Sequence, residues 1–120
     1  IVSVINISLR EDMETCVNQL GPINIKSLRP PDDVVKDVHS YGGLVLHDVI
    51  SLRYARKAIS QGVDGIIAVC ACAGGHAGPL SPFALVKEFR KEFDGTVILS
   101  GSITNGMDVL AARAMGDDLA

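Results

Sequence analysis

A single histidine set among three glycines is the feature of this sequence that best fits a catalytic role. Residues 70–82 read Cys-Ala-Cys-Ala-Gly-Gly-His-Ala-Gly-Pro-Leu-Ser-Pro, and the histidine is His76. Glycine lets a backbone approach a flat ligand or an anion closely and permits positive φ angles. An imidazole in such a loop can reach a bound substrate and exchange protons near neutral pH. The alternative is a loop that needs its glycines only to turn, with His76 in solvent.

A second loop has the composition of an anion site. Residues 100–106 read Ser-Gly-Ser-Ile-Thr-Asn-Gly and lie between an expected strand and an expected helix. Small residues with free N–H groups at a helix N-terminus suit a phosphate. The spacing matches neither a P-loop nor a dinucleotide fingerprint. An ordinary turn capped by Ser or Thr is the alternative.

The other candidate ligands are weaker. Cys70, Cys72 and His76 offer three metal ligands, but a closed zinc site needs four and Cys-x-Cys is not the common clip, so we expect no metal site. His47 and Asp48 end an expected strand, and both could touch the pocket of His76. The alternative, favoured for His47, is that one faces the core with a hydrogen bond and the other caps the next helix.

Short apolar runs alternate with amphipathic segments along the whole chain. Expected strands cover residues 1–7, 23–28, 44–50, 65–69 and 96–99, and expected helices cover 11–20, a segment from 30, a segment capped by Ser51, 81–93 and 106–115. Strict alternation predicts parallel strands, in a doubly wound sheet or in part of a (β/α)8 barrel. In both folds the loops after the strands carry function.

The bulk properties exclude several classes of protein. The net charge is −3 and the basic residues are scattered, which argues against nucleic-acid binding. The longest apolar stretch, residues 65–75, is too short to span a bilayer. Three cysteines without scaffold spacing predict reduced thiols in a cytoplasmic protein.

Several segments resemble the nitronate monooxygenases, formerly called 2-nitropropane dioxygenases. The most specific is residues 73–85, around His76, and residues 42–49, 62–65 and 99–103 are also similar. Flavin-dependent enoyl-acyl-carrier-protein reductases carry a similar Gly-Gly-His loop, but the long match after His76 is closer to the nitronate group.

The resemblance implies a (β/α)8 barrel with non-covalent FMN above the C-terminal ends of its strands. A complete barrel needs about 250 residues, so residues 1–120 are expected to form one partial barrel domain of five to six βα units, truncated at both ends. The resemblance makes His76 the catalytic base and assigns no role to Asp48. It places FMN against these residues: Asn6, Gly74, Gly75, Ser100, Gly101 and Ser102. Relatives often have two glycines where this chain has Gly101-Ser102.

The expected reaction is FMN-dependent oxidation of nitronates or nitroalkanes with O₂, giving a carbonyl compound and nitrite. One alternative is an enoyl-acyl-carrier-protein reductase that uses NAD(P)H on the same flavin site. Another is a flavin-less barrel fragment that acts as a binding or structural module. The expected partners are a small-molecule substrate and O₂, and a homo-oligomer is compatible with the sequence.

Overall fold

The computed structural model describes residues 2–4, 9–27 and 32–120, and in these ranges five strands alternate with five helices. The strands are β1 (Val2–Val4), β2 (Ile23–Lys26), β3 (Leu44–Val49), β4 (Gly65–Val69) and β5 (Thr96–Ser100). The helices are α1 (Leu9–Asn18), α2 (Asp32–His39), α3 (Leu52–Ser60), α4 (Pro82–Arg90) and α5 (Gly106–Met115). The predicted alternation is confirmed.

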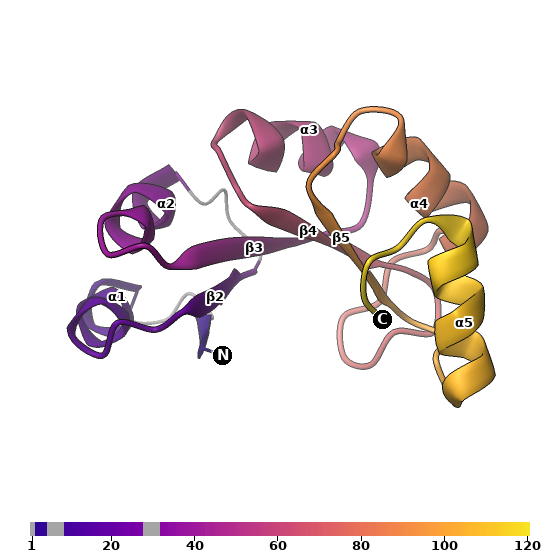
Figure 1. Cartoon of the computed structure of the whole chain (residues 1–120), viewed down its shortest axis with the longest axis horizontal. Coiled ribbons are helices and arrows are strands. Elements are labelled where there is room, and N and C mark those ends of the chain that lie inside the picture. Colours follow the sequence, from indigo (N-terminus) through magenta and orange to yellow (C-terminus); the bar gives the residue numbers. More distant parts are fainter. Residues whose placement is uncertain (1, 5–8, 28–31) are drawn as a thin grey trace.

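The strands form one parallel sheet in the order β1-β2-β3-β4-β5. A doubly wound sheet reverses its strand order at a switch point, and this sheet does not. Because every crossover advances in the same direction, right-handed connections place the helices on one face. Figure 1 shows them as an arc from α1 through α3 to α5, outside the strands. An isolated parallel bridge also joins Leu119 to Ile98 of β5. The sheet is therefore a sector of a (β/α)8 barrel.

The core fills the space between the sheet and the helices. Alternate residues of the central strands, such as Val45, Ile66 and Val97, are fully buried there. The helices contribute an aliphatic layer and one fully buried aromatic ring, Phe89, and such aliphatic packing is typical of a parallel sheet. The opposite face of the sheet is less covered, since Ile67 is only partly buried there.

Two aspartates anchor successive parts of the sheet in the same way. Asp64 precedes β4, and its carboxylate accepts a hydrogen bond from the N–H of Val45 in β3 at 2.7 Å. The same oxygen lies 2.8 Å from Nε2 of His39, at the end of α2. His39 is exposed and paired with this carboxylate.

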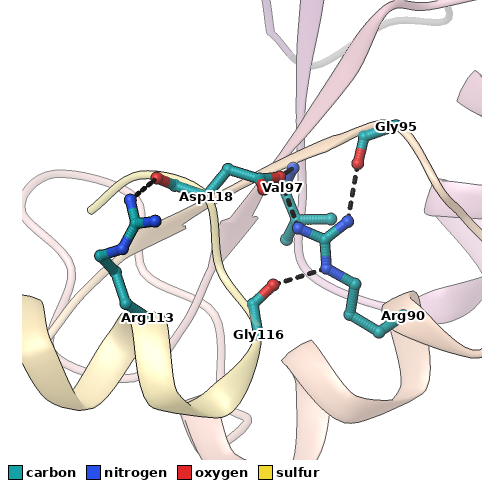
Figure 2. A network of polar contacts seen from close by, with 6 residues as sticks. All are labelled: Arg90, Gly95, Val97, Arg113, Gly116 and Asp118. Carbon is teal, nitrogen blue, oxygen red and sulfur yellow. Dashed lines mark hydrogen bonds and ion pairs between the residues drawn. The ribbon is translucent and has the colours of Figure 1, made fainter.

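Asp118 repeats the arrangement two units later. Its carboxylate accepts a hydrogen bond from the N–H of Val97 in β5 at 2.9 Å and pairs with the guanidinium of Arg90 in α4. Figure 2 shows that Arg90 also donates to the carbonyls of Gly95 and Gly116, at 2.7 and 2.6 Å. The network fixes Gly116 and Asp118 against the end of α4 and the start of β5.

The neighbouring Asp117 is buried, and neither of its carboxylate oxygens has a hydrogen-bond partner among the described residues. Burial raises the pKa of Asp117 to about 6, although the charge of Arg90 opposes the shift. A carboxyl group with a raised folded pKa stabilises the protein below its unfolded pKa of 3.8. That contribution is lost as the pH rises through about 6.

We therefore expect Asp117→Asn to change the pH dependence of stability. Between pH 4 and pH 8 the parent should lose on the order of 2 kcal/mol of unfolding free energy relative to the variant, because Asn cannot ionise. Urea unfolding across this pH range measures the difference. Asp94→Asn, at an exposed turn, is the matched control. If the unfolding free energies of the parent and of Asp117→Asn change in the same way with pH, the pKa of Asp117 is not raised.

Helix ends differ in detail from the sequence prediction. Ser51 occupies the N-cap of α3 in an extended conformation, but its side chain makes no capping hydrogen bond. Helix α1 spans Leu9–Asn18 rather than residues 11–20, because the chain turns at Leu20, which has a φ of 48°. None of the described helices is both long and apolar enough to cross a bilayer.

Candidate functional site

The histidine loop, residues 70–81, follows the C-terminal end of β4, and backbone hydrogen bonds join its two ends. The N–H of Ala71 donates to the carbonyl of Leu80 at 2.8 Å, which brings the two arms of the loop together. The N–H of Cys70 donates to the carbonyl of Ser100 at 2.8 Å and joins the loop to the end of β5. The tip between these arms, including His76, is exposed. Hydrogen bonds at the ends of β4 and β5 thus fix both arms of the loop, and His76 at its tip stays exposed.

The glycines of this loop have two different roles. A Cβ at Gly78 would lie 2.2 Å from the carbonyl oxygen of Val69, so the packing of the loop on β4 requires glycine there. A Cβ on Gly74 or Gly75 would meet nothing within 4 Å, although Gly75 has a φ of +72°. The protein itself therefore gives Gly74 no steric reason to lack a side chain. It leaves bare backbone beside His76.

His76 forms part of the wall of a pocket of about 240 Å³ at the ends of β3 and β4. The pocket is lined by His47, Asp48, Val49, Ile50, Tyr54, Val69 and His76. Its wall is largely apolar, with two imidazoles, one carboxylate and one phenol. This composition is typical of a small-molecule site, where a few polar groups orient a ligand.

His47 and Asp48 both line this pocket, as one of the sequence alternatives held. His47 is also buried, with 7% of its surface exposed, and its Nδ1 lies 2.7 Å from the carbonyl oxygen of Lys26. Burial lowers the pKa of His47 from its ordinary value. Asp48 does not cap α3. Its carboxylate accepts a hydrogen bond from the hydroxyl of Ser27 at 2.8 Å.

The predicted phosphate loop packs directly on the histidine loop. The hydroxyl of Ser102 donates to the carbonyl of Ala71 at 3.2 Å, and its N–H donates to the carbonyl of Cys72 at 3.4 Å. Gly101 has a φ of +129°, and a Cβ there would lie 2.7 Å from the Ala71 oxygen. The structure brings Ser100, Gly101 and Ser102 beside the histidine loop. It also engages Ser102 in the contact between the loops.

The N-terminus of α5 carries its own carboxylate, which the sequence analysis missed. Asn105 accepts a hydrogen bond from the N–H of Met107 at 2.8 Å. Asp108 accepts from the N–H of Thr104 at 2.8 Å and of Asn105 at 3.1 Å. Hydrogen bonds from Thr104 lower the pKa of Asp108. An Asn followed three residues later by an acid was the available signal, since this spacing forms a capping box.

The two cysteines of the histidine loop differ in burial. Cys70 is fully buried, and burial raises its pKa to about 11, so its thiol stays protonated. Cys72 is exposed at the loop tip. Within the described ranges, no three His, Cys, Asp or Glu side chains gather where they could hold a metal ion. Asn6, the remaining predicted flavin contact, lies outside the described residues.

Sequential parallel strands, an outer layer of helices and a histidine loop at the C-terminal edge define the class, a (β/α)8-barrel protein with a small-molecule site. A model of the FMN-dependent dehydrogenase family matches residues 33–120. The chain belongs to the FMN-dependent dehydrogenase family. Dehydrogenases that depend on FMN define this family.

The similarity to nitronate monooxygenases is also confirmed. The nitronate monooxygenase of Paraburkholderia phytofirmans is 33% identical over 96 residues, which cover 72% of this chain and 26% of that protein. A (3aS,4S,5R,7aS)-5-hydroxy-7a-methyl-1-oxo-octahydro-1H-indene-4-carboxyl-CoA dehydrogenase of Rhodococcus jostii is 27% identical over 90 residues, 75% of this chain and 26% of that protein. This chain therefore spans about a quarter of the length of these relatives.

A solved structure matches the fold over nearly the whole chain. The M276A mutant of FabK from Thermotoga maritima superposes with a TM-score of 0.90 at 25% identity. The match covers 98% of this chain and 39% of that one. The sheet and its outer helices therefore have the arrangement found within that longer chain, which confirms the predicted partial barrel.

Proposed function

We propose that the protein oxidises nitronates and nitroalkanes with FMN and O₂, giving a carbonyl compound and nitrite. The observation that carries the proposal is His76, exposed at the tip of a glycine loop and lining a largely apolar pocket. Membership of an FMN-dependent family and 33% identity to a nitronate monooxygenase support the choice of chemistry.

His76 is the base that this reaction requires. A neutral nitroalkane has an acidic C–H next to the nitro group, and the nitronate forms when that proton moves to a ring nitrogen of His76. The apolar wall of Val49, Ile50 and Val69 leaves the small alkyl part of the substrate without competing polar contacts. Such positioned proton transfer contributes typically ~10²- to 10⁴-fold to a rate.

The loops fit a flat cofactor with a phosphate tail. FMN, when bound, accepts the electrons of the substrate and passes them to O₂. Gly74 and Gly75 offer bare backbone where a Cβ would meet only open space, which suits a flat ring. Ser100, Gly101 and Ser102, which lie beside the histidine loop, are proposed to hold the phosphate. Asn6 is proposed to lie near the ring.

The Gly74→Ala variant tests whether FMN contacts the backbone at Gly74, because it should change FMN affinity without changing the stability of the protein. The added methyl group meets nothing within 4 Å in the protein, so the unfolding free energy should change by less than ~0.5 kcal/mol. If the flavin ring lies against this backbone, FMN affinity should fall by about 10-fold or more, because the methyl group takes its place. Fluorescence titration of the apoprotein with FMN measures the affinity. Unchanged affinity contradicts the proposed contact.

An absorption spectrum of the purified protein, recorded with nitroethane in the presence and absence of O₂, tests the proposed function. Flavin bands that bleach with nitroethane only in the absence of O₂ are the expected result. A yellow protein that ignores nitroethane but bleaches with NADH is instead a reductase. A protein that stays colourless after incubation with FMN contradicts the flavin proposal altogether.

A further inference from the structure

One ring nitrogen of a buried histidine in the pocket wall is engaged by a backbone carbonyl. His47 is more than nine-tenths buried at the end of β3, and its Nδ1 lies 2.7 Å from the carbonyl oxygen of Lys26. A carbonyl oxygen only accepts hydrogen bonds, so Nδ1 must carry the hydrogen. In the neutral ring Nε2 then carries a lone pair. Within the described part of the chain no hydrogen bond reaches Nε2, although His47 lines the pocket.

The surroundings keep this ring uncharged. Burial is the largest influence and lowers the pKa of His47, and the nearby charge of Lys26 acts in the same direction. The Lys26 carbonyl and the charge of Asp48 act in the opposite direction and are outweighed. Tyr54 and His76 are the other titratable groups of the pocket wall. His47 therefore presents a fixed acceptor in a wall to which Val49, Ile50 and Val69 contribute aliphatic side chains.

We propose that Nε2 of His47 accepts a hydrogen bond from a hydroxyl or N–H group of the substrate and so selects substrates that carry such a donor. This inference rests on the proposed function and names the substrate class within it. A substrate whose remote end is an alkyl group leaves the buried acceptor unpaired, which is costly. A carboxylate is disfavoured further, because its oxygens offer only lone pairs to Nε2.

Three nitro compounds of similar length distinguish these cases. In 3-nitropropan-1-ol a hydroxyl group stands where 1-nitrobutane has a methyl group, and 3-nitropropionate has a carboxylate. We expect kcat/KM to be about 10-fold higher for the alcohol than for 1-nitrobutane, the effect of one hydrogen bond to a buried group. The carboxylate should be the poorest substrate of the three.

Variants of His47 test whether this residue causes the preference. His47→Phe keeps a ring of similar size without an acceptor and should lower the ratio of kcat/KM for the alcohol to kcat/KM for 1-nitrobutane to about 1, because the alcohol loses its hydrogen bond. His47→Gln places an amide oxygen near the position of Nε2 and should restore part of the ratio. His39→Gln removes a histidine outside the pocket and should leave the ratio unchanged.

A measurement independent of turnover separates this inference from the proposed function. In ¹⁵N NMR spectra of the histidine-labelled FMN-bound protein, Nε2 of His47 should have the shift of an unprotonated imidazole nitrogen at pH 7. Butan-1-ol should move it, and 1-methoxypropane, an isomer without a donor, should not.

If nitroalkanes are not oxidised but the alcohol moves this resonance, the proposed function fails and the acceptor role stands. If the alcohol and 1-nitrobutane are oxidised with equal kcat/KM, the acceptor role of His47 is overturned and the proposed function stands. A protonated Nε2, or a resonance that does not move with butan-1-ol, overturns it as well.

Discussion

Replacing His76 with asparagine is expected to slow the oxidation of neutral nitroalkanes by about 10²- to 10⁴-fold while the protein remains yellow. Asparagine can fill the exposed loop tip and form hydrogen bonds, but it cannot take up the proton from carbon. His76 makes no protein hydrogen bond among the described contacts, so its removal should not disturb the fold. Steady-state oxygen consumption with nitroethane measures the effect.

A preformed nitronate provides a control for the His76→Asn variant. A nitronate prepared in alkali before mixing has already lost the proton, so its turnover by His76→Asn should stay within a few-fold of the parent. His39→Asn replaces a histidine at the end of α2, away from the pocket, and should match the parent with both substrates. If His76→Asn oxidises nitroethane like the parent, His76 is not the base.

Gly78→Ala is expected to cost about 2–3 kcal/mol of unfolding free energy, the upper range for overpacking. The new Cβ would stand 2.2 Å from the carbonyl oxygen of Val69, and it would also lie 3.4 Å from Cβ of Ile50. Backbone rather than a flexible side chain is the obstacle, so the loop has to lift away from β4. Both Val69 and Ile50 line the pocket, so catalytic activity should fall with stability.

Urea unfolding at constant pH measures this loss. Gly74→Ala makes the same chemical change in the same loop, four residues earlier and in open space, and should leave the midpoint unchanged. A stability for Gly78→Ala within ~0.5 kcal/mol of the parent means that the loop does not rest on β4 as described.

The sequence was enough to predict the strand and helix order, because apolar runs and amphipathic segments alternate along the chain. It did not choose between a doubly wound sheet and a barrel from pattern alone. That choice depends on which strands are neighbours, and the observed order from β1 to β5 settles it. The family resemblance had already favoured the barrel.

The sequence predicted those parts of the site whose role follows from residue type. It predicted less well the parts whose role depends on contacts with other segments of the chain. The glycines pointed to the loop of His76, but the sequence could not show that Gly78 serves packing and Gly74 does not. It named His47 as a pocket residue or a core residue, and the structure makes it both. The role of Asp108 at α5 was missed because Ser and Gly residues drew the prediction to the preceding turn.

The aspartate anchors have a consequence for the order in which the chain folds. Asp64 bonds the backbone of Val45 only 19 residues earlier, and Asp118 bonds Val97 only 21 residues earlier. Such short separations carry a small loop-closure entropy and a low contact order, which favour rapid folding. In both cases the aspartate secures the strand that precedes it. A chain emerging from the ribosome can therefore assemble this sheet progressively, from N-terminus to C-terminus, before a barrel closes.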